Sequence, residues 1–266
     1  MSFFDLADLP YLQAAGTTLD QEERASLAVS LPVKQNQERL PNIALWGKIQ
    51  GVSGDYLVAQ SWSDDAPFER KFYYQRGDRA QWLQLPEVST EDLETFAPLG
   101  ERFKGDPAFE ITASAANGET RTINEEKRLA IVVMLITYDL QTVPRGAYYR
   151  DSTSRIVRNP AYAGLSESEA LSLTNFYHFQ PNVDINEKSI SERSGTYVES
   201  LDIFRSLAQD RPIETWSSQQ ADNGRIRLLR SRQWPGYLFW AVLGTPKFGG
   251  LYVGTGVRNN DLGFMA

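Results

Sequence analysis

The sequence predicts an α+β fold, with a mainly antiparallel β-sheet and a few packed helices. Three observations indicate this class. Short β-favouring runs joined by glycine-containing turns form separate blocks from the helical patterns, without the regular alternation of β-α-β units. The chain has 266 residues, 41% of them hydrophobic, which is enough to bury a large core. No linker or low-complexity stretch interrupts it, so we expect residues 1–266 to form a single domain.

The first expected element is a short N-terminal helix at about residues 17–31. Thr18 stands three positions before Gln21, which is a capping-box spacing, and acidic residues fill the first turn. We expect this helix to end before Pro32, because proline lacks the N–H that a helix interior needs.

Strands follow in pairs. The runs 42–50 and 55–61 flank a Gly-Val-Ser-Gly turn and predict a hairpin. Aromatic-rich runs on either side of residues 76–79 predict a second reversal, in which Gly77 supplies the conformational freedom. Further strand material is expected to turn at residues 117–118, an Asn-Gly pair.

The middle of the chain predicts helices. A helix is expected over residues 124–141, with its stripe packed on the sheet, because apolar residues recur there at helical spacing: Leu129, Val132, Val133, Ile136 and Leu140. Its β-branched residues leave a strand as the competing interpretation. After a strand pair within residues 143–160, two more helices are expected, one beginning at Ser166 and one over residues 196–210.

Strands return at the C-terminus, over residues 213–219, 225–231, 236–244 and 250–259. The stretch 230–240, RSRQWPGYLFW, is unusually aromatic. We expect Leu238 and Trp240 to face the core and Trp234 to sit at a turn, available to a partner.

The composition excludes several classes of function. The absence of cysteine removes disulfides, thiolate catalysis and cysteine-ligated metals. The net charge of −7 argues against nucleic-acid binding. The longest apolar run, residues 129–136, is far shorter than a membrane helix, and the N-terminus does not resemble a secretory signal. We therefore expect an intracellular protein that binds neither nucleic acid nor membrane.

We identify no catalytic, cofactor-binding or metal-binding residue. His178 is the single histidine, and its position at the end of a predicted helix favours a role in capping terminal carbonyl groups. Two alternatives stay open. A carbohydrate-active hydrolase would need two convergent carboxylates in a deep cleft, and a β-rich module for a small ligand would need a closed apolar cavity.

Two arginine clusters stand out in this acidic chain. The first contains Arg145, Arg150, Arg155 and Arg158, and the second contains Arg225, Arg227, Arg230 and Arg232. In a strand, Arg225 and Arg227 would share one face, and the other two would share the opposite face. Either the charges protect a solvated edge strand from aggregation, or arginines and aromatics form a protein interface. The candidate interface residues are Trp234, Arg225, Arg227, Arg230, Arg232, Arg145 and Arg150.

Long segments of the chain resemble the radial spoke head protein 9 family of ciliary and flagellar axonemes. They include LWGKIQGVSGDYLVAQS, FKGDPAFE, EEKRLAIVVMLI, VPRGAYYR, YAGLSESEALSLTNFYHF, ESLDIFRSL, LLRSRQWPGYLFW and FGGLYVGTGVRNNDLGFM. They occur in the family's order and cover nearly the whole chain.

The resemblance implies a non-enzymatic structural subunit of the radial spoke head. Its implied partners are radial spoke head proteins 4 and 6 and neighbouring spoke proteins such as number 1. The family's spoke head faces the central pair of microtubules and relays mechanical signals towards the dynein arms. The acidic excess of this chain predicts that contact with the central pair is brief and screened.

Overall fold

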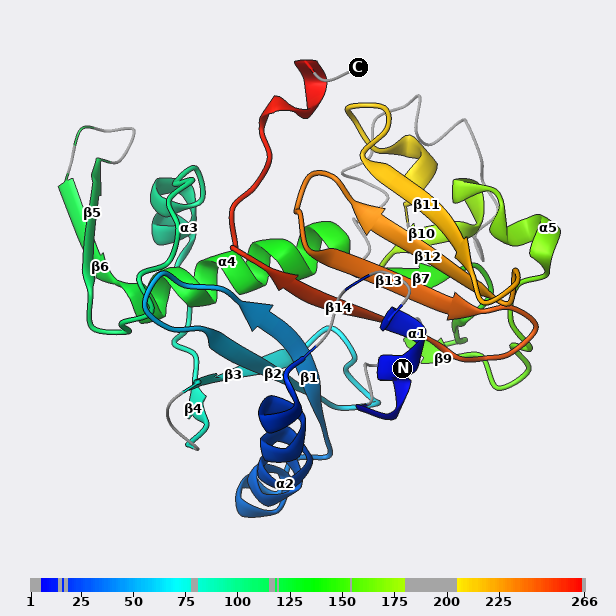
Figure 1. Ribbon diagram of the computed structural model, residues 1–266, viewed down its shortest axis with the longest axis horizontal. Coiled ribbons are helices and arrows are strands. Elements are labelled where there is room, and N and C mark those ends of the chain that lie inside the picture. The colour runs from blue at the N-terminus through cyan, green and yellow to red at the C-terminus, as the bar shows by residue number, and fades with distance from the viewer. Residues whose placement is uncertain are drawn as a thin grey trace.

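An eight-stranded sheet forms the centre of the computed structural model, which describes residues 6–13, 16, 19–77, 81–114, 118, 120–153, 155–179 and 205–264. Figure 1 shows the strands in the order β11 (Trp216–Ala221), β12 (Ile226–Ser231), β13 (Tyr237–Val242), β14 (Phe248–Gly254), β1 (Asn42–Ile49), β2 (Tyr56–Trp62), β3 (Arg70–Arg76) and β4 (Leu83–Gln84). Every neighbouring pair is antiparallel except β1 and β14, which are parallel. The predicted α+β class with a mainly antiparallel sheet is confirmed.

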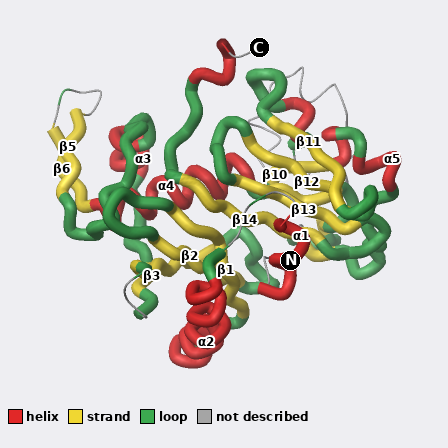
Figure 2. Tube along the Cα trace, in the orientation of Figure 1, coloured by secondary structure: helices red, strands yellow, loops and turns green. Residues whose placement is uncertain are grey.

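Helices and short strand pairs surround the sheet (Figure 2). The α-helices are α1 (Leu9–Gln13), α2 (Gln21–Glu38), α3 (Thr90–Phe96), α4 (Glu125–Leu140) and α5 (Glu167–Ala170), and the 3-10 helices are η1 (Leu6–Asp8), η2 (Leu173–Asn175), η3 (Leu207–Gln209) and η4 (Asp261–Phe264). The strand pairs are β5 (Glu110–Ser114) with β6 (Thr120–Asn124), β7 (Thr142–Pro144) with β10 (Phe176–His178), and β8 (Tyr148–Arg150) with β9 (Ile156–Arg158).

The two faces of the sheet bury different clusters. Helix α4 packs on one face, and its predicted stripe from Leu129 to Leu140 is buried there, which confirms the helix. On the other face, Leu12 of α1 and Leu27 and Leu31 of α2 pack against strand residues. Burying each of these side chains stabilises the fold by roughly 1.5–3 kcal/mol.

The helix predictions need three corrections. Helix α2 begins after Asp20 and continues through Pro32 to Glu38, so proline does not end it, although one backbone hydrogen bond is lost there. The helix predicted from Ser166 is wrong beyond its first turn, because the chain continues as η2 and then as β10. The helix predicted over residues 196–210 lies mostly outside the described residues, and its described end is the 3-10 helix η3.

The strand predictions are confirmed in position but not at every end, because β11 begins only at Trp216 and β14 ends at Gly254. The first hairpin is β1–β2, and β3–β4 and β5–β6 reverse where the glycine-containing turns predicted. The β1–β14 pair was beyond prediction, because its strands are about two hundred residues apart in sequence. At this pair Gly47 is essential, since a Cβ there would lie 2.2 Å from the carbonyl oxygen of Tyr252.

A buried carboxylate joins three distant segments. Glu125, the first residue of α4, is fully buried and accepts hydrogen bonds from the backbone N–H groups of Lys104 (2.6 Å), Gly105 (2.7 Å) and Asp106 (3.1 Å). The hydroxyl of Tyr56 on β2 donates a fourth, at 2.7 Å, and burial beside Glu125 raises the pKa of this phenol and keeps it a donor. We call these five residues the Glu125 clamp.

The turn of the first hairpin packs on the same loop. Val52 N–H donates to the carbonyl of Phe103 at 2.9 Å, and Gly105 has a φ of 91°, which favours glycine. A side chain at Gly105 would lie 2.5 Å from the carbonyl oxygen of Gly54. Three of the segments that carry the family resemblance therefore meet at one buried junction.

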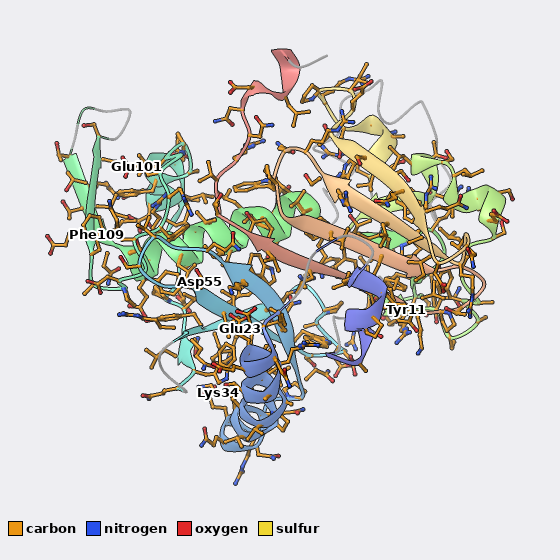
Figure 3. All side chains as sticks on the ribbon, in the orientation of Figure 1. Tyr11, Glu23, Lys34, Asp55, Glu101 and Phe109 are labelled. Carbon is orange, nitrogen blue, oxygen red and sulfur yellow. The ribbon has the colours of Figure 1, made fainter. Side chains whose placement is uncertain are left out.

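A second polar contact ties α2 to this hairpin. Lys48 Nζ lies 2.7 Å from Glu23 of α2 and 2.9 Å from Asp55, which precedes β2. Figure 3 shows Glu23 and Asp55 on these neighbouring elements. Burial alone would lower the pKa of Lys48, but the two carboxylates hold it above its ordinary value, so the amine stays charged.

Candidate protein-interaction surface

The second arginine cluster lies on β12 and its two ends. Arg227 and Arg230 are within the strand, and the unbroken register with β11 and β13 places their side chains on opposite faces. Arg225 and Arg232 flank the strand, with side chains 76% and 51% exposed. Their ion pairs, with Asp222 at 3.8 Å and Glu214 at 3.2 Å, are at the surface and contribute little to stability.

Arg227 is not a surface residue, which corrects its place among the candidates. It is 8% exposed, and burial lowers the pKa of its guanidinium. The physical reason is that both faces of the sheet are covered at β12, where Leu228 packs into the cluster on one face and Leu229 into the cluster on the other. Arg230 is half-buried on the opposite face, so Arg225 and Arg232 are the most accessible members of this cluster.

Trp234 sits at a turn, as predicted, but it is not available to a partner. Tyr237 N–H donates to its carbonyl at 3.2 Å, which closes the turn. The indole is 2% exposed, and its Nε1–H donates to Asp139 of α4 at 2.9 Å. Leu238 and Trp240 are each 1% exposed and face the core, as predicted. The aromatic side chains of residues 230–240 are therefore part of the packed interior, and the arginines of this stretch are more exposed.

The first arginine cluster lies on a different part of the fold. Arg145 is exposed in the turn after β7, and its Nη1 lies 3.5 Å from Asn175 Oδ1. Arg150 is half-buried at the end of β8. These two residues belong to the small strand pairs beside the main sheet and not to β12.

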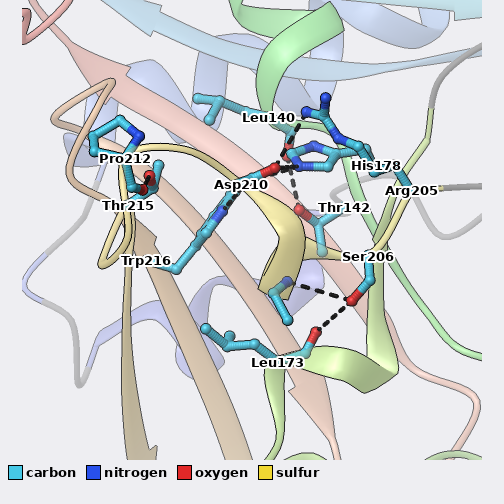
Figure 4. A network of polar contacts seen from close by, with 11 residues as sticks. Leu140, Thr142, Leu173, His178, Arg205, Ser206, Asp210, Pro212, Thr215 and Trp216 are labelled. Carbon is cyan, nitrogen blue, oxygen red and sulfur yellow. Dashed lines mark hydrogen bonds and ion pairs between the residues drawn. The ribbon is translucent and has the colours of Figure 1, made fainter. Parts of the chain in front are cut away.

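A buried network anchors the segment that leads into β11 (Figure 4). The carboxylate of Asp210 accepts from Trp216 Nε1 at 2.8 Å and from Arg205 at 3.2 Å, and His178 Nε2 lies 2.8 Å from both of its oxygens. Burial alone would raise the pKa of Asp210, but the hydrogen bonds from His178 and Trp216 and the charge of Arg205 hold it below its ordinary value. Because the ionised carboxylate can only accept, His178 Nε2 carries the proton.

His178 therefore has a different role from the predicted helix cap. It lies on β10, is 2% exposed and orients Asp210. A histidine–aspartate pair can serve catalysis, but it needs a nucleophile in reach. Among the described residues, the side-chain hydrogen bonds of this pair lead only to Trp216 and Arg205, so the arrangement positions β11.

The described cavities do not favour the two alternative functions. A small cavity of about 40 Å³ between α4 and the sheet has room for water but is far below the ~300 Å³ of a ligand pocket. An open groove of about 770 Å³ lies beside α4 and β3, and the carboxylates in its lining, Glu69 and Glu87, are exposed. Within the described ranges, acidic and histidine side chains form no cluster that could hold a metal ion.

No pattern in the sequence indicated the Asp210 network or the burial of Trp234. Their partners lie 32 and 95 residues away along the chain.

No helix in the described part of the chain combines the length and apolar character needed to cross a bilayer.

The structure defines the class of fold: an α+β protein built on an eight-stranded, mainly antiparallel sheet, with exposed arginines at the two ends of β12. Residues 5–81 match the family described as radial spokehead-like protein. Three relatives are named radial spoke head protein 9 homolog. The zebrafish (Danio rerio) protein is 35% identical over 95% of both chains, the human protein is 33% identical over 98% of both, and that of Xenopus tropicalis is 32% identical over 97% of this chain and 96% of its own. The chain belongs to the radial spoke head protein 9 family.

Proposed function

We propose that the chain is a non-enzymatic structural subunit of the axonemal radial spoke head, needed for spoke head assembly and for ciliary or flagellar motility. The observation that carries this proposal is the similarity to radial spoke head protein 9 homologues along 95–98% of the chain. Its partners would be radial spoke head proteins 4 and 6 and neighbouring spoke proteins such as number 1. In this role it transmits mechanical signals between the central pair and the dynein arms.

The way the fold is held together supports a load-bearing role. The Glu125 clamp joins β2, α4 and the loop at 104–106, and β1 pairs directly with β14 from the far end of the chain. Because strands from both ends share one sheet, we infer that residues 1–266 act as one domain. A force on one part of such a sheet is passed on through its hydrogen bonds.

The accessible arginines are our proposed contact residues. Arg225 and Arg232 are exposed at the two ends of β12, and Arg230 is half-buried within it. The other two proposed contact residues, Arg145 and Arg150, lie beside the small strand pairs. Arginine is enriched at binding hot spots, because its planar group makes several hydrogen bonds at once. The acidic remainder of the chain supports transient, screened contact with the central pair.

The test uses the full chain and recombinant radial spoke head proteins 4 and 6. The double variant Arg225→Glu with Arg232→Glu should weaken binding by at least tenfold, since two contact charges are reversed at an interface. Arg39→Glu is the matched control, because Arg39 is an exposed arginine at the end of α2. If the wild-type chain binds neither of these two proteins, the proposed partners are wrong. Equal binding of the double variant and the wild type would remove the β12 arginines from the contact.

A further inference from the structure

Strand β11 is an open edge of the main sheet. It pairs on one side with β12 over six residues in unbroken antiparallel register, and it has no strand on its other side in the described structure. Arg232 N–H donates to the carbonyl of Thr215, so alternate residues after Thr215 bond to β12. The backbone groups of Trp216, Ser218 and Gln220 therefore point outwards. The described residues give these outward groups no backbone partner.

This edge lacks the usual protection against pairing. Edge strands are commonly shortened, charged, bulged or broken by proline. The other edge, β4, is short, with two residues, and Pro86 follows it closely. In contrast, β11 reads Trp-Ser-Ser-Gln-Gln-Ala, with no charge, proline, glycine or bulge. Its residues 218–220 are exposed, and Ile213, just before the strand, is 71% exposed and offers an apolar anchor.

The charge around this edge is opposite to that of the chain. Residues 205–232 contain six arginines and three acidic residues, although the whole chain has a net charge of −7. Arg211 and Arg232 are exposed before and beside the start of β11, and Arg225 is exposed near its end. Antiparallel pairing of β11 with a second copy would place Arg211 and Arg232 of one copy beside Arg225 of the other. Glu214 and Asp222, the acidic neighbours of Arg232 and Arg225, offset only part of this positive charge. Like charges at such close range disfavour that pairing.

We propose that β11 is a docking edge for an extended segment of another protein subunit, which adds a ninth strand to the sheet and carries acidic residues on either side of its pairing core. The backbone of Trp216, Ser218 and Gln220 supplies the hydrogen bonds, over about 20 Å of strand. The flanking arginines select the partner by charge, and the buried Asp210 network holds the start of the strand in place. This inference rests on the proposed assembly function and names the edge through which it works.

The first experiment compares two variants of one residue in binding to recombinant radial spoke head proteins 4 and 6. Ser218→Pro removes an outward N–H without touching a bond to β12, and Ser218→Ala keeps that N–H. We expect Ser218→Pro to weaken binding by about tenfold or more, and Ser218→Ala to stay within about twofold of wild type. If wild type binds and folded Ser218→Pro binds equally well, the docking edge is wrong while the proposed function stands. If wild type binds neither protein, the proposed function itself fails and the inference falls with it.

The second experiment needs no variant and so does not depend on the folding of Ser218→Pro. Residue-level amide exchange is measured on the wild-type chain, alone and in the complex. We expect the amides of Trp216, Ser218 and Gln220 to slow by at least tenfold on binding, whereas those of Ser217 and Gln219 are already slow. Outward amides that are equally slow in the isolated chain, because the chain or a second copy covers them, would overturn the proposal. Outward amides that stay fast in the complex would also overturn it.

Discussion

Replacing Glu125 with glutamine tests how the fold is held together. The substitution keeps the volume of the side chain but replaces one carboxylate oxygen with an NH2 group, which cannot accept. With Oε1 still accepting from Tyr56 and Gly105, the amide nitrogen faces the N–H of Lys104, whose present bond is 2.6 Å long. One charged hydrogen bond is lost, a buried donor is left unsatisfied, and the remaining bonds are weaker.

The expected cost is about 3 kcal/mol, since a hydrogen bond to a charged group contributes roughly 1.5–3 kcal/mol and an unsatisfied buried donor costs roughly 1–3 kcal/mol. In a chain of this size, that lowers the melting temperature by about 6–12 °C. Urea denaturation followed by circular dichroism measures the free energy directly. Glu126→Gln is the matched control, because Glu126 also lies in the first turn of α4 but is only half-buried, and it should cost less than about 1 kcal/mol. A Glu125→Gln variant as stable as the Glu126→Gln variant would refute the clamp.

Three further predictions concern buried groups. Trp234→Ala should lower the free energy of unfolding by about 3–5 kcal/mol, because it empties a packed site and leaves Asp139 without its indole donor. A variant that is as stable as wild type and has lost only partner binding would contradict this. Gly105→Ala should cost more than about 1 kcal/mol in urea denaturation, because its φ is 91° and its Cβ would meet a carbonyl oxygen at 2.5 Å. The lowered pKa of Asp210 predicts stabilisation that is complete above about pH 4 and is lost as the pH falls further, so the stability gap between wild type and Asp210→Asn should shrink from pH 5 to pH 3. A gap that stays constant would show that the Asp210 charge does not stabilise the fold.

Local signals in the sequence predicted most of the elements. Asn124 caps α4 with its side chain at 3.1 Å from Lys127 N–H, and the apolar stripe of this helix is buried on the sheet as its spacing indicated. The hairpins followed from glycine-containing turns, whose chemistry acts over a few residues. The placement of Arg227 and Arg230 on opposite faces of β12 also followed from strand periodicity.

Features that depend on the order of the strands in the sheet could not be predicted from the sequence. Tryptophan and arginine are residue types that favour an interface, but Trp234 and Arg227 are buried. Arg227 is buried because both faces of the sheet are covered at β12, and Trp234 is buried because it packs beside Asp139 of α4. His178 ended a plausible helix, but pairing with β7 draws it into a strand. The open edge at β11 could not be recognised either, since a sequence does not state which strand is outermost.

The central claim is that this chain works by assembling with other spoke proteins, and affinity purification of the full-length chain from motile cilia, with quantitative mass spectrometry, tests it most directly. We expect radial spoke head proteins 4 and 6 to be recovered with it in a constant ratio, and the ratio to fall when Arg225 and Arg232 are both replaced by glutamate. Recovery of the chain free of any spoke protein, under conditions that keep spokes intact, would contradict the claim.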